Sequence, residues 1–169
     1  MRAILQGHFK RTTRLWGLAT LAAIGLSIAT GQVLADESIN TGYFGGVAIM
    51  GYDPVAYFTD NKAVKGSEKY SYDWLGTPWH FASSEHKEMF AADPIKYAPQ
   101  YGGYCAAEVV GGSVTVDIDP NAFKIIDGKL YLIYDKPHGD DFAFHAENVA
   151  AADANWPKVK GRLELDKHF

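Results

Sequence analysis

The sequence predicts an α+β fold, a small single domain in which short antiparallel strands pack with several helices and a long C-terminal helix. Three observations support this class. Polar and aromatic residues alternate over 69–74 and are followed by a second short β-prone run at 79–82. Two further β-prone runs, 122–126 and 129–134, are close enough to pair as a hairpin. Apolar residues at helical spacing extend over 140–156.

The first 35 residues have the pattern of a secretory signal peptide. Four basic residues and no acidic residue precede an almost wholly apolar or small run from Leu15 to Thr30, and Val33-Leu34-Ala35 supplies a small-x-small cleavage pattern. We therefore expect cleavage after Ala35 and export to the periplasm or beyond. An uncleaved anchor is the alternative, but the run is shorter than the ~20 residues of a spanning helix, so we expect no membrane span after cleavage.

The exported part of the chain is acidic. Four of the 16 basic residues lie in the signal segment, so 12 basic and 20 acidic residues remain in 134 residues, a formal charge of −8. This length suggests one domain. The charge argues against nucleic acid as a partner, because such binding depends on Lys and Arg neutralising phosphates.

The domain is expected to begin near Met50. Residues 36–49 lack periodicity, which indicates a flexible lead-in, and we place the domain at 50–160 with a C-terminal tail at 161–169. Gly51-Tyr52-Asp53-Pro54 is typical of a turn. The short apolar run that follows it, 55–58, is β-prone.

The middle of the chain predicts a hairpin followed by two helices. Leu75 to Pro78 would form the turn of the first hairpin. Ser83 or Ser84 can cap a helix that runs to about Ala92, and Asp93-Pro94 can start a second, shorter helix. The segment 104–110 is compatible with either helix or strand.

The last third predicts a second hairpin and the long helix. Asp127-Gly128 is a two-residue turn signal between the strands of the hairpin. Phe142, His145, Val149 and Trp156 share one face of the helix expected over 140–156. We see no internal repeat in the sequence.

Several of these segments resemble the YHS domain, in particular its secreted bacterial subgroup. The resemblance covers most of residues 50–157. The segments that carry it are GYDPVAYF (51–58), WHFAS (79–83), Phe90 with Asp93-Pro94 and Tyr97, QYGGYCA (100–106), DGKLYL (127–132) and ADANWP (152–157).

The resemblance implies metal handling, but this chain departs from the family's cysteine pattern. Cysteine-bearing members place one cysteine after Asp-Pro-Val, where this chain has Ala56, and a pair in a Phe-Cys-Ser-x-x-Cys run. Ala82 and His86 stand at the two positions of that pair. Of these three positions, the resemblance therefore implies a metal ligand only at His86.

The residues themselves suggest a mixed metal site that binds copper. His86 and Met89 are three apart on one face of the expected helix, Cys105 follows a Gly-Gly turn, and His80 precedes the helix. Imidazole, thiolate and thioether are ligands that suit copper. We thus expect an exported protein that binds copper, for metal trafficking or sensing, with Cys105 and His86 as primary ligands and a metal-handling protein as partner.

Other interpretations of the same residues stay open. Cys105, the single cysteine of the chain, can be buried and inert, ligate metal or pair with another chain. Met89 fits a core position and His80 a solvated one. The alternative function is a non-catalytic module that binds a protein or a small ligand without metal. A Cys105–His86 nucleophile and base is conceivable, but no third orienting residue is evident, so we do not expect an enzyme.

Overall fold

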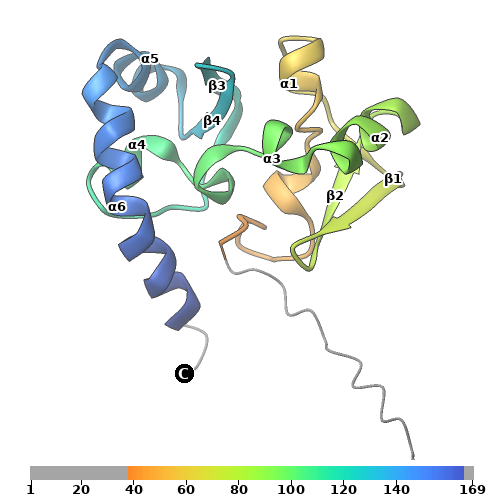
Figure 1. Cartoon of the computed structure of the whole chain (residues 1–169), viewed down its shortest axis with the longest axis horizontal. Helices are drawn as coiled ribbons and strands as arrows, with labels where there is room; N and C mark the ends of the chain where they lie inside the picture. Colours follow the sequence, from red (N-terminus) through yellow and green to blue (C-terminus); the bar gives the residue numbers. More distant parts are fainter. Residues whose placement is uncertain (1–37, 166–169) are drawn as a thin grey trace, which may run out of the picture. The chain divides into compact units, whose positions relative to one another are not determined.

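The computed structural model describes residues 38–165 (Figure 1). The predicted signal peptide and its cleavage site lie outside the described residues. The described part of the chain contains no helix long and apolar enough to cross a membrane.

The order of the elements confirms the α+β class. From the N-terminal side, the first elements are a 3-10 turn η1 (Ala48–Gly51), α1 (Ala56–Thr59), β1 (Ser67–Trp74), β2 (Thr77–Phe81), α2 (Ser84–Ala92) and α3 (Pro94–Tyr97). The remaining elements are η2 (Gln100–Gly103), α4 (Ala106–Val110), β3 (Asp119–Ile126), β4 (Lys129–Ile133), α5 (Lys136–Phe144) and α6 (Ala146–Leu165). Each pair of strands forms a two-stranded antiparallel hairpin, as expected.

The β-prone run at 55–58 is helical, so its prediction as a strand is wrong. The Asp53 side chain accepts hydrogen bonds from the backbone N–H groups of Val55 (2.9 Å) and Ala56 (3.3 Å). These contacts satisfy donors at the start of α1 that have no partner inside the helix. A capping carboxylate therefore overrides the β-propensity of this short segment.

The single helix predicted over 140–156 is in fact two. His145 has an extended backbone (φ −107°, ψ 104°) between α5 and α6. α6 continues to Leu165, so the tail predicted from 161 is helical as far as that residue. Side-chain hydrogen bonds hold α6, among them Tyr101 Oη to Asp153 Oδ1 (2.8 Å) and Asn155 Nδ2 to the carbonyl of Val110 (2.9 Å).

The expected loose lead-in is part of the packed structure from Ser38 onward. Asn40 is fully buried, and its Nδ2 donates to the carbonyls of Gly103 and Val116, each at 3.0 Å. Its backbone N–H donates to the carbonyl of Gly102, and its own carbonyl accepts from the N–H of Ile49. Residues upstream of the predicted domain start near Met50 are therefore packed as well, because the buried Asn40 joins η1 to η2.

The structure contains an internal repeat that is not visible in the sequence. Every paired position of the β1–β2 hairpin recurs 52 residues later in β3–β4: Ser67 pairs with Phe81 and Asp119 with Ile133. The bulge also recurs, between 67 and 71 in one hairpin and between 119 and 123 in the other. We call residues 48–92 repeat one and residues 100–144 repeat two.

The 3-10 turns and the helices α2 and α5 obey the same 52-residue shift, whereas α4 begins two residues before the position that the shift would give α1. η1 and η2 both contain three consecutive residues with positive φ, 49–51 and 101–103. α2 and α5 are each nine residues long and begin 52 residues apart. Few residues are identical between the repeats, which explains why the sequence did not reveal them. The identical pairs are Gly51/Gly103, Tyr52/Tyr104, Val64/Val116, Gly76/Gly128, His86/His138, Phe90/Phe142 and Ala91/Ala143.

Each repeat contributes a hydrophobic cluster, and β4 belongs to both. Trp79, Phe81 and Phe90 lie in the first cluster, and their counterparts Tyr131, Ile133 and Phe142 lie in the second. Leu130 and Leu132, on the other face of β4, pack in the first cluster. β4 is therefore buried on both faces and joins the two repeats into one core.

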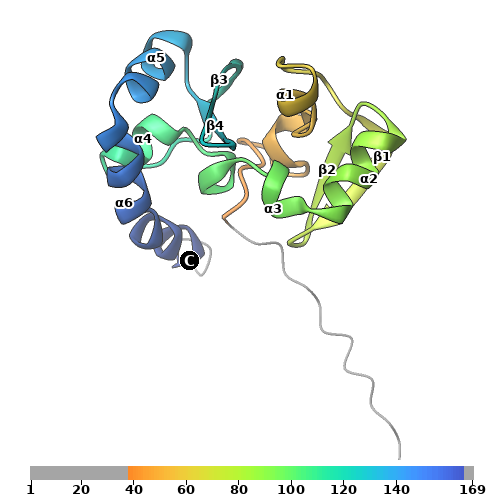
Figure 2. The same ribbon diagram turned by 45° about the horizontal axis from the view of Figure 1, so that its top comes forward.

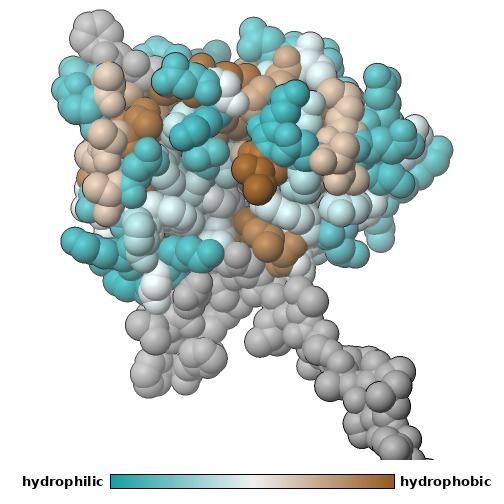
Figure 3. All heavy atoms as spheres, in the orientation of Figure 1, coloured by the Kyte–Doolittle hydropathy of each residue, from teal (hydrophilic) through white to brown (hydrophobic). Residues whose placement is uncertain are grey.

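The surface in Figure 3 is mainly polar, with small hydrophobic areas that polar side chains separate. The large hydrophobic residues that are exposed come from different elements and loops. They are Tyr43, Phe44, Leu75, Ile95, Ile125 and Tyr134.

Because Ser38 packs on η2, we expect Gly102→Ala to lower the free energy of unfolding strongly. A Cβ at Gly102 would lie 1.4 Å from the carbonyl oxygen of Ser38, and the residue has φ +62°. Gly128 is a matched control, because it has φ +73° but no atom within 4 Å of the added Cβ. We expect Gly128→Ala to cost about 1 kcal/mol in urea unfolding and Gly102→Ala several kcal/mol. Equal losses would show that residues 38–40 do not pack on η2.

Candidate functional site

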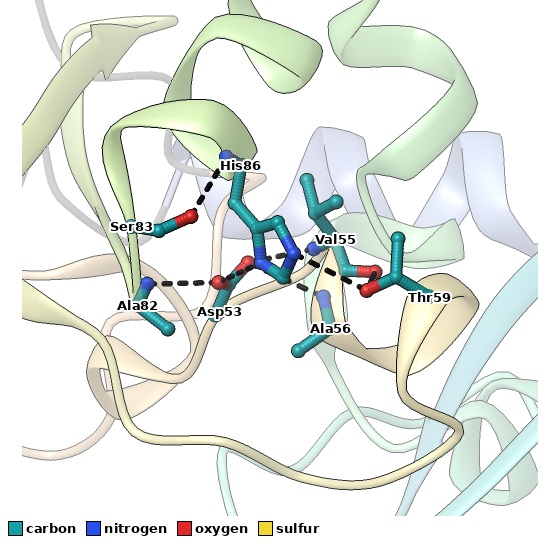
Figure 4. A network of polar contacts seen from close by, with 7 residues as sticks. All are labelled: Asp53, Val55, Ala56, Thr59, Ala82, Ser83 and His86. Carbon is teal, nitrogen blue, oxygen red and sulfur yellow. Dashed lines mark hydrogen bonds and ion pairs between the residues drawn. The ribbon is translucent and has the colours of Figure 1, made fainter.

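The side chain of Asp53 is the centre of a polar network in repeat one. Asp53 is fully buried, and its Oδ1 accepts the two hydrogen bonds at the start of α1 described above. Its Oδ2 accepts from the backbone N–H of Ala82 (2.8 Å), just after β2, and lies 2.6 Å from His86 Nδ1 (Figure 4). One carboxylate thus connects α1, the end of β2 and α2.

His86 is held in one orientation by this carboxylate. The residue lies in the first turn of α2, where its backbone N–H donates to the N-cap residue Ser83 (3.1 Å). Because Asp53 contacts Nδ1, the opposite ring nitrogen, Nε2, is directed to the exposed Thr59 at the end of α1, 3.3 Å from its Oγ1. The His86 side chain is 15% exposed, so the imidazole separates the buried carboxylate from solvent.

The contact between His86 and Thr59 is replaceable. The Thr59 hydroxyl has one proton to donate, and the carbonyl of Val55, 3.2 Å away, is an acceptor for it as well. If another group took Nε2, the hydroxyl would keep this partner. The network therefore fixes one ring nitrogen firmly and leaves the other available to an incoming ligand, an arrangement common among metal-binding histidines.

His80 lies in a different environment from His86. It is on the face of β2 opposite Trp79 and Phe81 and lies beside Gly51, which the ammonium group of Lys65 also approaches. Lys65 also donates to the carbonyl of Met50 and lies over the ring of Tyr52. A fixed cation beside His80 disfavours a metal ion there.

Met89 and Cys105 are core residues of different clusters. Met89 packs, partly buried, against the first cluster. Cys105 is 1% exposed in the second cluster. Both views of the ribbon place α4, which Cys105 precedes, well apart from α2, which carries His86 (Figures 1 and 2).

The structure therefore does not bring Cys105, His86, His80 and Met89 together as one ligand set. Over residues 38–165 it places no group of three or more His, Cys, Asp and Glu side chains so that they could hold a metal ion. The copper site expected from these four residues does not fit the fold. What repeat one offers instead is the oriented imidazole of His86, with Asp53 behind it and Thr59 in front.

Sequence reasoning missed Asp53 and Thr59 as members of the site. The sequence indicates only a turn at Asp53, before Pro54. An aspartate two residues before a short apolar segment is also a capping signal, but nothing in the sequence indicates that its second oxygen reaches Ala82 and His86. No sequence pattern indicates that Thr59 lies near His86, because this position depends on α1 being a helix.

Comparison with known families identifies repeat one. The family model described as the YHS domain matches residues 55–101. Residues 55–101 are thus similar to the YHS domain. The match begins at α1 and ends in η2, where repeat two starts, so repeat two lies almost wholly outside it.

YHS domains are generally associated with the handling of metals, copper among them. No curated protein matches the chain, and no solved structure matches it. The family match therefore supplies a general association with metals, and the residues that serve it here have to be argued from this structure.

The network around Asp53 predicts a large stability loss for Asp53→Ala. The substitution leaves three backbone N–H groups and His86 Nδ1 without their acceptor, and we expect about 3 kcal/mol or more in chemical unfolding. Asp93→Ala is the control, since Asp93 is an exposed N-cap whose side chain accepts from Lys96 N alone. This control should cost about 1 kcal/mol. Similar losses in the two variants would contradict the central role of Asp53.

Burial raises the pKa of the Cys105 thiol, although backbone N–H groups that donate to the sulfur oppose this effect. A thiol with a raised pKa stabilises the fold fully below its ordinary pKa, and this contribution is lost as the pH rises through the folded-state value. The free energy of unfolding should therefore fall more between about pH 7 and about pH 10 in the wild type than in Cys105→Ala. Parallel pH profiles would show that the thiol is not buried in the folded protein.

Proposed function

We propose that this chain is an exported copper-handling protein that binds the ion through Nε2 of His86. The observation that carries the proposal is the 2.6 Å contact between His86 Nδ1 and the buried Asp53 carboxylate. Histidines that ligate metals usually donate their other ring N–H to a carboxylate or a carbonyl, which fixes the ring and raises the basicity of the ligating nitrogen. The family association with metals and the signal-peptide pattern support the same reading.

A single imidazole cannot enclose an ion, and this suits a protein that passes metal on. The remaining positions around the ion would be filled by water or by the ligands of a metal-handling partner. Thr59 can give up Nε2 without losing its hydrogen bond to Val55. Exposure of the site at the surface would let a partner approach His86 directly.

The proposal predicts that copper binding depends on His86 and on its orienting carboxylate. In a Cu(II) titration of the purified protein, His86→Ala should weaken binding at least tenfold. Asp53→Asn should weaken it by about 10- to 100-fold if it folds, because outer-shell partners contribute on this scale. Circular dichroism would verify that each variant is folded.

His80→Ala is the matched control, because it removes a histidine that lies six residues away beside Lys65. Its affinity should stay within about twofold of the wild type. An affinity for Cu(II) that His86→Ala leaves unchanged would refute the proposal and favour a binding module without metal.

A further inference from the structure

The internal repeat gives Cys105 a counterpart whose role is visible. A shift of 52 residues takes Asp53 to Cys105 and His86 to His138, just as it relates the registers of the two hairpins and the bounds of α2 and α5. Asp53 is 0% exposed and Cys105 is 1% exposed. The thiol of repeat two thus occupies the position of the carboxylate of repeat one.

Three equivalent backbone groups surround Asp53 in repeat one and Cys105 in repeat two. In repeat one, the N–H groups of Val55, Ala56 and Ala82 donate to Asp53. In repeat two, the backbone groups that act on the Cys105 thiol and lower its pKa are those that follow from the 52-residue shift. They belong to Ala107, Glu108 and Tyr134. The sulfur therefore lies in a pocket of donors that holds an anion in the other copy.

His138 has the backbone position of His86 but a different ring partner. Its N–H donates to the N-cap residue Asp135 (2.9 Å), as the N–H of His86 does to Ser83. The ring of His138 also turns to Asp135, with Nδ1 at 2.7 Å from Oδ1. The side chain is 60% exposed, against 15% for His86. In repeat one the shorter Ser83 cannot compete for the ring, so His86 is free to reach Asp53.

We propose that Cys105 and His138 form a second metal site, a thiolate–imidazole pair that binds Cu(I) when the ring of His138 turns from Asp135 onto the sulfur. The orientation that His86 adopts in repeat one is the orientation that brings His138 to Cys105. Binding the ion releases the thiol proton to solvent, and the three N–H donors then stabilise the thiolate. The proposal rests on the proposed function only in taking copper as the ion.

The ligand types select Cu(I) among the common ions. Thiolate is a soft ligand that favours Cu(I), and imidazole also suits copper. Zn²⁺ in structural sites takes four protein ligands, whereas Cu(I) is stable with two. The pair does not include His86, so the two repeats would hold copper through different donors: nitrogen alone in repeat one, and sulfur with nitrogen in repeat two.

The test is a competition for Cu(I) between the purified protein and a chromophoric Cu(I) chelator, under anaerobic and reducing conditions. Cys105→Ser and His138→Gln should each weaken the tighter Cu(I) site at least tenfold. His145→Gln, which removes another partly exposed histidine of the same region, should leave the affinity unchanged. Unfolding curves recorded on each variant separate loss of the site from loss of the fold.

A gain-of-affinity variant keeps the test decisive even if Cys105→Ser folds poorly. Asp135→Ser gives repeat two the N-cap residue of repeat one and removes the competing partner of the His138 ring. We expect it to tighten Cu(I) binding severalfold. The inference is overturned if Asp135→Ser has no effect, or if His138→Gln binds Cu(I) as the wild type does.

The outcomes for the two sites are independent. Loss of Cu(II) binding in His86→Ala bears on repeat one alone, and loss of Cu(I) binding in His138→Gln bears on repeat two alone. Failure of one result therefore does not imply failure of the other.

Discussion

The buried carboxylate of Asp53 is the interaction on which the rest of repeat one depends. A carboxylate with no exposed surface is tolerated because four donors surround it, three from the backbone and one from His86. These donors come from segments far apart in the sequence. The carboxylate therefore converts a β-prone run into α1, fixes the start of α2 against the end of β2, and sets the orientation of the one imidazole that faces solvent from this network.

The same backbone pocket occurs twice, and it holds a different side chain each time. With Asp53 it holds a carboxyl side chain whose partner ring, that of His86, is already in place. With Cys105 it holds a neutral, buried thiol, and the equivalent ring is turned to Asp135. Two substitutions between the copies, Asp53 to Cys105 and Ser83 to Asp135, thus change an assembled network into one that can assemble on binding. This difference is the physical basis for proposing two copper sites of unlike chemistry in one small domain.

Much of the fold was predictable from local signals, and most of the site was not. The hairpins, the caps of α2 and α3 at Ser83 and Asp93, and the family of repeat one follow from patterns of neighbouring residues. The pairing of Cys105 with His86 did not hold, because the two residues belong to different repeats. Asn40, Asp53 and Thr59 act through partners more than 25 residues away, or through a helix that propensity disfavours, and no local pattern records such contacts.

The central claim is that Asp53 and Cys105 occupy equivalent pockets, and the stability of Cys105→Asp tests it most directly. A carboxylate placed in a hydrophobic core without donors would cost several kcal/mol and would unfold a domain of this size. Because Ala107, Glu108 and Tyr134 present their N–H groups to this position, we predict that Cys105→Asp folds, with a loss of no more than about 2 kcal/mol. Val109→Asp, at a fully buried position of the same cluster, should not fold. If Cys105→Asp is as disruptive as Val109→Asp, the two pockets are not equivalent.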